Sequence, residues 1–177
     1  MNSYTDNIMR KIYLILFLLG IGFGLQAQQT DPAYVKKLDQ LYEETVPLVQ
    51  PEELAEMVEN GQEVIMLDTR QKREFEVSHI EGARFVDFDG FRKKDVADIP
   101  KDAKVVVYCS VGYRSERIGE QLQALGFEDV SNLYGGIFEW KNQGHEVVDK
   151  AGEETERVHT FDRDWGQWLL TGEKVYK

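Results

Sequence analysis

The residues best suited to chemistry lie in one short stretch, 105–115, which reads VVVYCSVGYRS and contains Cys109, the one cysteine of the 177-residue chain. A cysteine thiolate is a strong nucleophile, and it is favoured where amide N–H groups or a helix N-terminus point at the sulfur. Gly112 permits a sharp turn that could surround the sulfur with such donors, and Arg114 has a forked guanidinium suited to an oxyanion. This pattern predicts a nucleophilic cysteine, with a buried structural cysteine as the alternative.

The elements that must position Cys109 can be read on either side of it. Residues 105–108 form a short, β-branched apolar run, which is typical of a buried strand in a parallel sheet. From Ser115 the apolar residues fall at helical spacing as far as Leu125, and Gly126 is suited to end that helix. We therefore expect Cys109 at the carboxyl end of a strand, in a loop that leads into a helix.

A second strand end carries polar residues. The apolar run 64–67 ends in Asp68-Thr69-Arg70, and a helical stretch over 71–77 leads to a further strand over 84–86. Alternating strands and helices of this size predict an α/β fold with a mainly parallel central sheet and helices on both faces. Ligands of such sheets bind beyond the carboxyl ends of the strands, where we expect both Asp68 and Cys109. Asp68 is suited to orient a donor, to move a proton or to hold the loop, and Arg70 to brace the crevice or bind an anion.

Three separated motifs carry a family resemblance: LDTR followed by EFEVSHIEGA, then CSVGYRS, then LYGGIFEWKNQGHEVV at 133–148. In this order they resemble the rhodanese family of sulfurtransferases, in which a cysteine opens a six-residue loop and carries a persulfide. The loop here is Cys109–Arg114. The resemblance implies a rhodanese-like fold and an enzyme that transfers sulfane sulfur from a donor such as thiosulfate to a thiophilic acceptor.

The resemblance also assigns roles to individual residues. Cys109 is the catalytic residue, and the donor or the loop is bound by Ser110, Val111, Gly112, Tyr113, Arg114, Ser115, Arg70 and Asp68. For Asp68 and Arg70 a framework role is favoured, because an Asp-x-Arg strand end is common to family members that use different substrates. The implied partners are a small anionic sulfur donor and a thiol or cyanide acceptor, with no cofactor. Ser110 departs from the pattern, because thiosulfate-using members often have a basic residue after the cysteine, and this leaves the donor open.

Two other functions remain alternatives. Phosphatases and arsenate reductases also use a cysteine loop that ends in arginine, but they place five residues between the two, whereas this chain has four between Cys109 and Arg114. The tighter loop favours a single sulfur atom over a tetrahedral oxyanion. A sulfur-relay or redox module with little turnover is the other alternative, favoured by the lone thiol and by the aromatic C-terminal tail.

The N-terminus has the pattern of an export signal. Arg10 and Lys11 precede an apolar run over 12–24, and Leu25-Gln26-Ala27 suits a cleavage site. We expect a cleaved signal peptide at 1–27 and a periplasmic or extracellular protein, with an uncleaved anchor as the alternative. Cleavage removes a net charge of +1 from a chain of net charge −11. A mature chain this acidic has no general attraction for nucleic acid or for an anionic membrane, so we expect neither partner.

The remaining chain divides into three predicted parts: an N-terminal helical extension over 28–45, with a helix over 30–45, a rhodanese-like domain over 46–148, and a C-terminal extension over 149–177. The last part contains an apolar group made of Phe161, Trp165, Trp168, Leu169 and Leu170. We expect this group to pack on the domain or on the helix around Tyr34, with a protein-partner surface as the alternative. The histidines have no neighbours at metal-ligand spacing, so no metal site is predicted.

Overall fold

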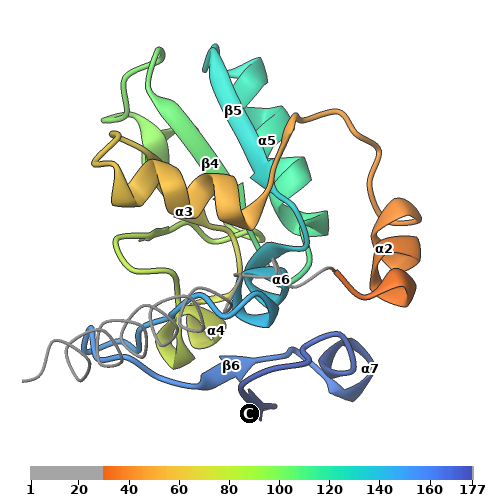
Figure 1. The fold of residues 1–177 in the computed structure, drawn as a ribbon. Helices are drawn as coiled ribbons and strands as arrows, with labels where there is room; N and C mark the ends of the chain where they lie inside the picture. Colours follow the sequence, from red (N-terminus) through yellow and green to blue (C-terminus); the bar gives the residue numbers. More distant parts are fainter. Residues whose placement is uncertain (1–29, 177) are drawn as a thin grey trace, which may run out of the picture.

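The structure is a computed structural model that describes residues 30–176. The predicted signal peptide at 1–27 lies outside the described residues. A parallel five-stranded sheet forms the centre of the described chain, in the order β1-β5-β4-β2-β3 (Figure 1). Its strands are β1 (Leu48–Val49), β2 (Ile65–Asp68), β3 (Arg84–Phe85), β4 (Lys104–Tyr108) and β5 (Asp129–Leu133).

The helices alternate with these strands along the chain. They are α2 (Pro32–Asp39), α3 (Pro51–Glu59), α4 (Lys72–Val77), the 3-10 helix η1 (Lys93–Val96), α5 (Tyr113–Ala124), α6 (Gly136–Asn142) and α7 (Arg163–Gly166). After α6, two short strands, β6 (Arg157–His159) and β7 (Glu173–Val175), pair in parallel on either side of α7. The predicted alternation of strands and helices is therefore confirmed.

Helices cover both faces of the central sheet, with α3 in front of the strands and α5 behind them in Figure 1. Along β4, Val106 and Tyr108 belong to the apolar cluster that contains residues of α3 and α6. Val105 and Val107 belong to the cluster that contains residues of α5. Because both faces of β4 are covered, the strand is apolar at consecutive positions rather than at alternate ones. The α/β fold with helices on both faces is thus confirmed.

The N-terminal helix is shorter than predicted. The apolar spacing predicts a helix over 30–45, but α2 ends at Asp39. Beyond it the Tyr42 hydroxyl donates to the carbonyl of Val111 at 2.8 Å, and main-chain N–H groups of the segment donate to the Glu116 carboxylate. These contacts with the cysteine loop and α5 replace the helical hydrogen bonds, so the chain runs on without regular secondary structure as far as 45.

The C-terminal segment packs against the N-terminal helix, as expected. Trp168 stacks on Tyr34 of α2 with ring centroids 5.4 Å apart, and Lys37 Nζ lies 5.2 Å from the centre of the Trp165 ring. Leu169 is fully buried. β6 also lies beside α4 (Figure 1). This docking brings the C-terminal segment to the end of the sheet at which β4 stops.

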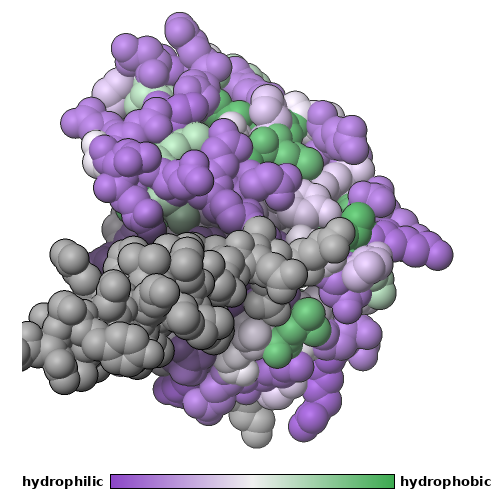
Figure 2. Space-filling model, viewed as in Figure 1, coloured by the Kyte–Doolittle hydropathy of each residue, from purple (hydrophilic) through white to green (hydrophobic). Residues whose placement is uncertain are grey.

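The molecular surface is mainly hydrophilic on the face seen in Figure 2, where hydrophobic residues form only small patches. This agrees with the net charge of −11. Within residues 30–176, no helix has both the length and the apolar composition needed to span a membrane.

Candidate active site

Cys109 lies directly after β4, the central strand, at the start of a tight loop. Gly112 has a φ of 93° and precedes α5, and its N–H donates to the Cys109 Sγ at 3.2 Å. The helix begins at Tyr113, earlier than the predicted Ser115, so Arg114 lies in its first turn. We expected several amides around the sulfur, but in the part of the chain that the structure describes Gly112 is the one main-chain donor to Sγ.

A pocket of about 450 Å³ opens above the sulfur. Cys109 itself is only 1% exposed, yet it is one of the residues that line this pocket. The lining residues come from the cysteine loop, from the segment after α2 and from the C-terminal segment: Leu41, Cys109, Ser110, Val111, Tyr113, Arg114, Phe161 and Trp165.

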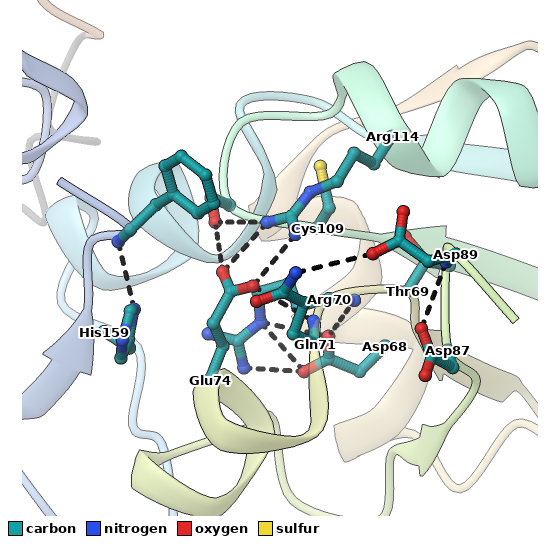
Figure 3. A network of polar contacts seen from close by, with 12 residues as sticks. Asp68, Thr69, Arg70, Gln71, Glu74, Asp87, Asp89, Cys109, Arg114 and His159 are labelled. Atoms are coloured by element: carbon teal, nitrogen blue, oxygen red, sulfur yellow. Dashed lines mark hydrogen bonds and ion pairs between the residues drawn. The ribbon is translucent and has the colours of Figure 1, made fainter. Parts of the chain in front are cut away.

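Arg114 forms an ion pair with the buried Glu74 of α4, a residue that the sequence analysis did not single out. Its two terminal nitrogens donate to the two Glu74 carboxylate oxygens at 2.9 Å each, and Nη2 also donates to the Ser110 hydroxyl at 3.1 Å. In Figure 3 the Arg114 side chain passes the Cys109 sulfur and ends above Glu74. Arg114 therefore ties the cysteine loop to α4.

The mutual attraction of Arg114 and Glu74 outweighs the burial that opposes their charges. Burial alone would raise the pKa of Glu74, but the hydrogen bonds and charge of Arg114 outweigh it and lower the pKa to about 2. Burial likewise opposes the Arg114 charge, but hydrogen bonding to Glu74 and attraction to Cys109 and Glu74 raise the pKa of Arg114 above its ordinary value. Both groups are charged at neutral pH, and the Glu74 carboxylate offsets the positive charge beside Cys109.

Contacts from distant parts of the chain hold the loop in place. The Tyr42 hydroxyl donates to Val111 O and accepts from the N–H of Gly135 at 2.9 Å. Gly136 has a φ of 58°, and a Cβ at this position would collide with the Cys109 carbonyl. The paired glycines of the third motif thus let α6 begin against the cysteine loop.

Ser115 and Gly112 support the loop rather than lining the pocket. The Ser115 hydroxyl donates to the Asn132 side chain at 2.7 Å, and Asn132 Nδ2 donates to Gly112 O at 3.0 Å. Ser115 is fully buried. Asn132 belongs to β5, so these bonds fix the loop relative to the sheet.

The structure places Asp68 and Arg70 in the interior, outside the pocket lining. The Asp68 carboxylate accepts from the Arg70 main-chain N–H at 3.0 Å and from its guanidinium at 2.6 Å. Arg70 also donates to the carbonyl of Ser78, at the end of α4. We expected Asp68 in the ligand crevice beside Cys109, but its pairing with Arg70 holds it below the surface. Both residues are placed to brace the framework.

Several site residues were missed because no local pattern marks their role. Glu74, Leu41 and Tyr42 lie in segments that read as ordinary amphipathic helices. Phe161 and Trp165 were recognised as apolar but were not linked to the cysteine. Within the described residues, no three His, Cys, Asp or Glu side chains gather as they would around a metal ion.

Together, the fold and the site define a class: a parallel α/β protein with a cysteine loop at the carboxyl end of its central strand. Residues 50–143, more than half of the chain, match the rhodanese-like domain. The chain therefore belongs to the rhodanese-like family, whose chemistry is of the sulfurtransferase type.

Individual relatives agree with this assignment. The chain is 30% identical over 96 residues to the probable adenylyltransferase/sulfurtransferase MoeZ of Mycobacterium tuberculosis, covering 54% of this chain and 24% of that protein. It is 35% identical over 100 residues to the tRNA uridine(34) hydroxylase of Listeria monocytogenes, covering 54% and 31%. It thus spans at most about a third of these two proteins. The crystal structure of a thiosulfate sulfurtransferase from Pseudomonas aeruginosa shares the fold, with a TM-score of 0.55 at 19% identity, covering 78% of this chain and 26% of that one.

Proposed function

We propose that this protein is an exported sulfurtransferase that carries sulfane sulfur as a persulfide on Cys109. The observation that carries the proposal is the position of the Cys109 sulfur, at the wall of a pocket, with the Gly112 N–H 3.2 Å away. A persulfide is anionic at neutral pH, and a main-chain N–H beside the sulfur favours negative charge there. The sulfurtransferase named among the relatives supports the same reaction class.

The reaction proceeds by two displacements. The Cys109 thiolate attacks the outer sulfur of a donor such as thiosulfate, a new S–S bond forms, and sulfite leaves with the electron pair of the broken S–S bond. Cyanide or a thiolate then attacks the outer sulfur of the persulfide, takes it away, and releases the Cys109 thiolate. Each step exchanges one bond for another, so no external oxidant or reductant is needed.

Mass spectrometry of the purified mature protein tests this proposal. After exposure to thiosulfate or another sulfane donor, Cys109 should gain one sulfur atom and lose it on addition of cyanide, with thiocyanate as the product. The Cys109→Ser variant should show neither change. Retained transfer in that variant, or no sulfur gain from any donor, would contradict the assignment.

The same experiment separates the two alternatives. Sulfur that is gained but released only to a protein acceptor would favour a relay module. Hydrolysis of a phosphate ester without persulfide formation would favour phosphatase chemistry. The geometry gives that second alternative less support, because both terminal nitrogens of Arg114 donate to Glu74 and Nη2 also donates to the Ser110 hydroxyl. This leaves the guanidinium fewer donors for a tetrahedral oxyanion.

Export is the second part of the proposal, supported by the basic, apolar and small-residue segments at 10–27. Expression of the full chain in a bacterial host, followed by fractionation and N-terminal sequencing, should find a periplasmic or secreted form that begins at Gln28. A full-length protein retained with the membrane fraction would favour the uncleaved anchor instead.

A further inference from the structure

The pocket above Cys109 is built partly by chain outside the rhodanese-like match, which covers residues 50–143. Leu41 contributes from the N-terminal side, and Phe161 and Trp165 from the C-terminal side. With Val111 and Tyr113 they form a largely apolar wall around the sulfur. At about 450 Å³, the pocket falls in the range of roughly 300–1,000 Å³ that is typical of sites for organic ligands. A small inorganic anion would occupy only a fraction of it.

The C-terminal part of this wall is firmly attached. The Asn142 side chain donates to the Trp168 carbonyl at 3.0 Å and accepts from the Leu170 N–H at 2.7 Å. Trp168 is further held by its stacking on Tyr34. These contacts join the C-terminal segment to α6 and α2, so Phe161 and Trp165 are held as fixed walls of the pocket.

Phe161 adopts a conformation that needs a local reason. Its φ is 66°, a left-handed value that L-residues with large side chains rarely adopt. Its N–H donates to the Nδ1 of the buried His159 at 3.0 Å, and its ring centre lies 5.9 Å from the Arg114 guanidinium. The residue as a whole is 43% exposed. The strained backbone therefore presents an exposed aromatic ring at the pocket rather than burying it.

The charge at the pocket, like its size and apolar wall, favours an organic ligand over a small dianion. Arg114 is the one cation among the described residues that line it, and its charge is offset by the two hydrogen bonds to Glu74. The chain as a whole carries a net charge of −11. A dianion such as thiosulfate thus finds little compensation here, whereas apolar surface is plentiful.

We propose that the preferred sulfur donor is an organic monoanion whose leaving group carries an apolar, aryl-sized substituent, held by Phe161 and Trp165. This inference rests on the proposed function and names its substrate class. An organic thiosulfonate illustrates the step: the Cys109 thiolate attacks the terminal sulfur, the S–S bond to the sulfonyl sulfur breaks, and the sulfinate leaves with that electron pair. Cys109 is left as the persulfide.

Three donors separate size from charge: benzenethiosulfonate, methanethiosulfonate and thiosulfate. The first two share one charge and differ in the apolar group, and thiosulfate carries a second charge. We would measure kcat/KM for thiocyanate formation, and divide each value by the rate constant for the reaction of the same donor with N-acetylcysteine. This removes differences in intrinsic reactivity. The wild-type protein should then prefer the phenyl donor over the methyl donor by tenfold or more.

Substitutions locate the preference in the C-terminal wall. Phe161→Ala and Trp165→Ala should each reduce the phenyl-to-methyl ratio about fivefold, as expected for loss of one aromatic contact. Leu170→Ala is the matched control, because this residue of the same segment is exposed and does not line the pocket, and its ratio should be unchanged.

The outcomes separate this inference from the proposed function. If all three donors form the Cys109 persulfide and the normalised phenyl-to-methyl ratio of the wild type is near one, the inference is wrong and the proposed function stands. If no donor forms the persulfide, the proposed function itself fails. Should the alanine variants not fold, competitive inhibition of the wild type by benzenesulfinate and methanesulfinate provides the second measurement. Equal inhibition by the two would overturn the inference.

Discussion

Replacing Glu74 by glutamine tests whether the ion pair between this buried carboxylate and the partly buried Arg114 holds the cysteine loop to α4. The pKa of Glu74 falls from an ordinary 4.5 to about 2, and each tenfold change in proton affinity corresponds to about 1.4 kcal/mol. The carboxylate charge therefore stabilises the fold by roughly 3 kcal/mol at neutral pH. Breaking a buried pair on one side typically costs about 3–5 kcal/mol, which agrees with this magnitude.

The sign of the pH dependence follows from the direction of the change in pKa. Because the pKa of Glu74 is lower in the folded state than in the unfolded chain, its stabilisation is complete above pH 4.5 and is lost as the pH falls toward 2. The difference in unfolding free energy between wild type and Glu74→Gln should thus be roughly 3 kcal/mol at pH 7 and narrow by about 2 kcal/mol at pH 3. The corresponding loss in melting temperature at pH 7 is roughly 6–12 °C.

Urea unfolding at pH 7, 5 and 3 measures this difference. Glu76→Gln is the matched control on the same helix, because the Glu76 side chain is 48% exposed and its ion pair with Lys72 spans 3.8 Å. The Glu76→Gln substitution should lower the free energy of unfolding by less than about 0.5 kcal/mol at every pH. The reasoning would be refuted if Glu74→Gln lowered the free energy of unfolding by less than about 1 kcal/mol at pH 7. It would also be refuted if the difference in unfolding free energy between wild type and variant were the same at pH 7 and pH 3.

Three further perturbations test how the site is held. Gly112→Ala places a side chain at a φ of 93°, where its Cβ meets the Tyr42 hydroxyl. We expect the free energy of unfolding to fall by about 2 kcal/mol and persulfide formation to slow. An unchanged melting temperature would contradict this prediction. Tyr42→Phe removes the hydroxyl that donates to Val111 O and accepts from Gly135 N–H. Urea unfolding should show that the free energy of unfolding falls by about 1–3 kcal/mol, and hydrogen exchange at the Gly135 amide should accelerate. A loss within experimental error would show that these bonds are replaced by water. Burial lowers the pKa of His159 from its ordinary 6.5, so the stability that this neutral ring contributes is complete above pH 6.5 and declines as the pH falls below it. A titration followed by NMR should find its midpoint below 6.5, and a midpoint at or above that value would contradict the prediction.

The fold and the position of the nucleophile could be read from the sequence because both depend on short-range patterns. The consecutive apolar residues of β4 indicate a strand covered on both faces, and Gly112 with the helical spacing after it indicates a loop that enters a helix. The three motifs, in their order along the chain, indicated the rhodanese family. Helix ends depend on longer-range contacts, and α2 ends early because Tyr42 and its neighbours make contacts with residues far along the chain.

The environment of the sulfur was decided by the tertiary structure alone. Arg114 and Glu74 are 40 positions apart, and no local pattern selects one carboxylate among the 32 acidic residues of the chain. Likewise, the C-terminal segment reads as an apolar group, but its docking, through the Asn142 hydrogen bonds and the stacking of Trp168 on Tyr34, is what brings Phe161 and Trp165 to the pocket that Cys109 lines. The physical reason is range: the patterns that form strands and helices act over a few residues, whereas the charge and shape of a pocket depend on which distant surfaces pack together.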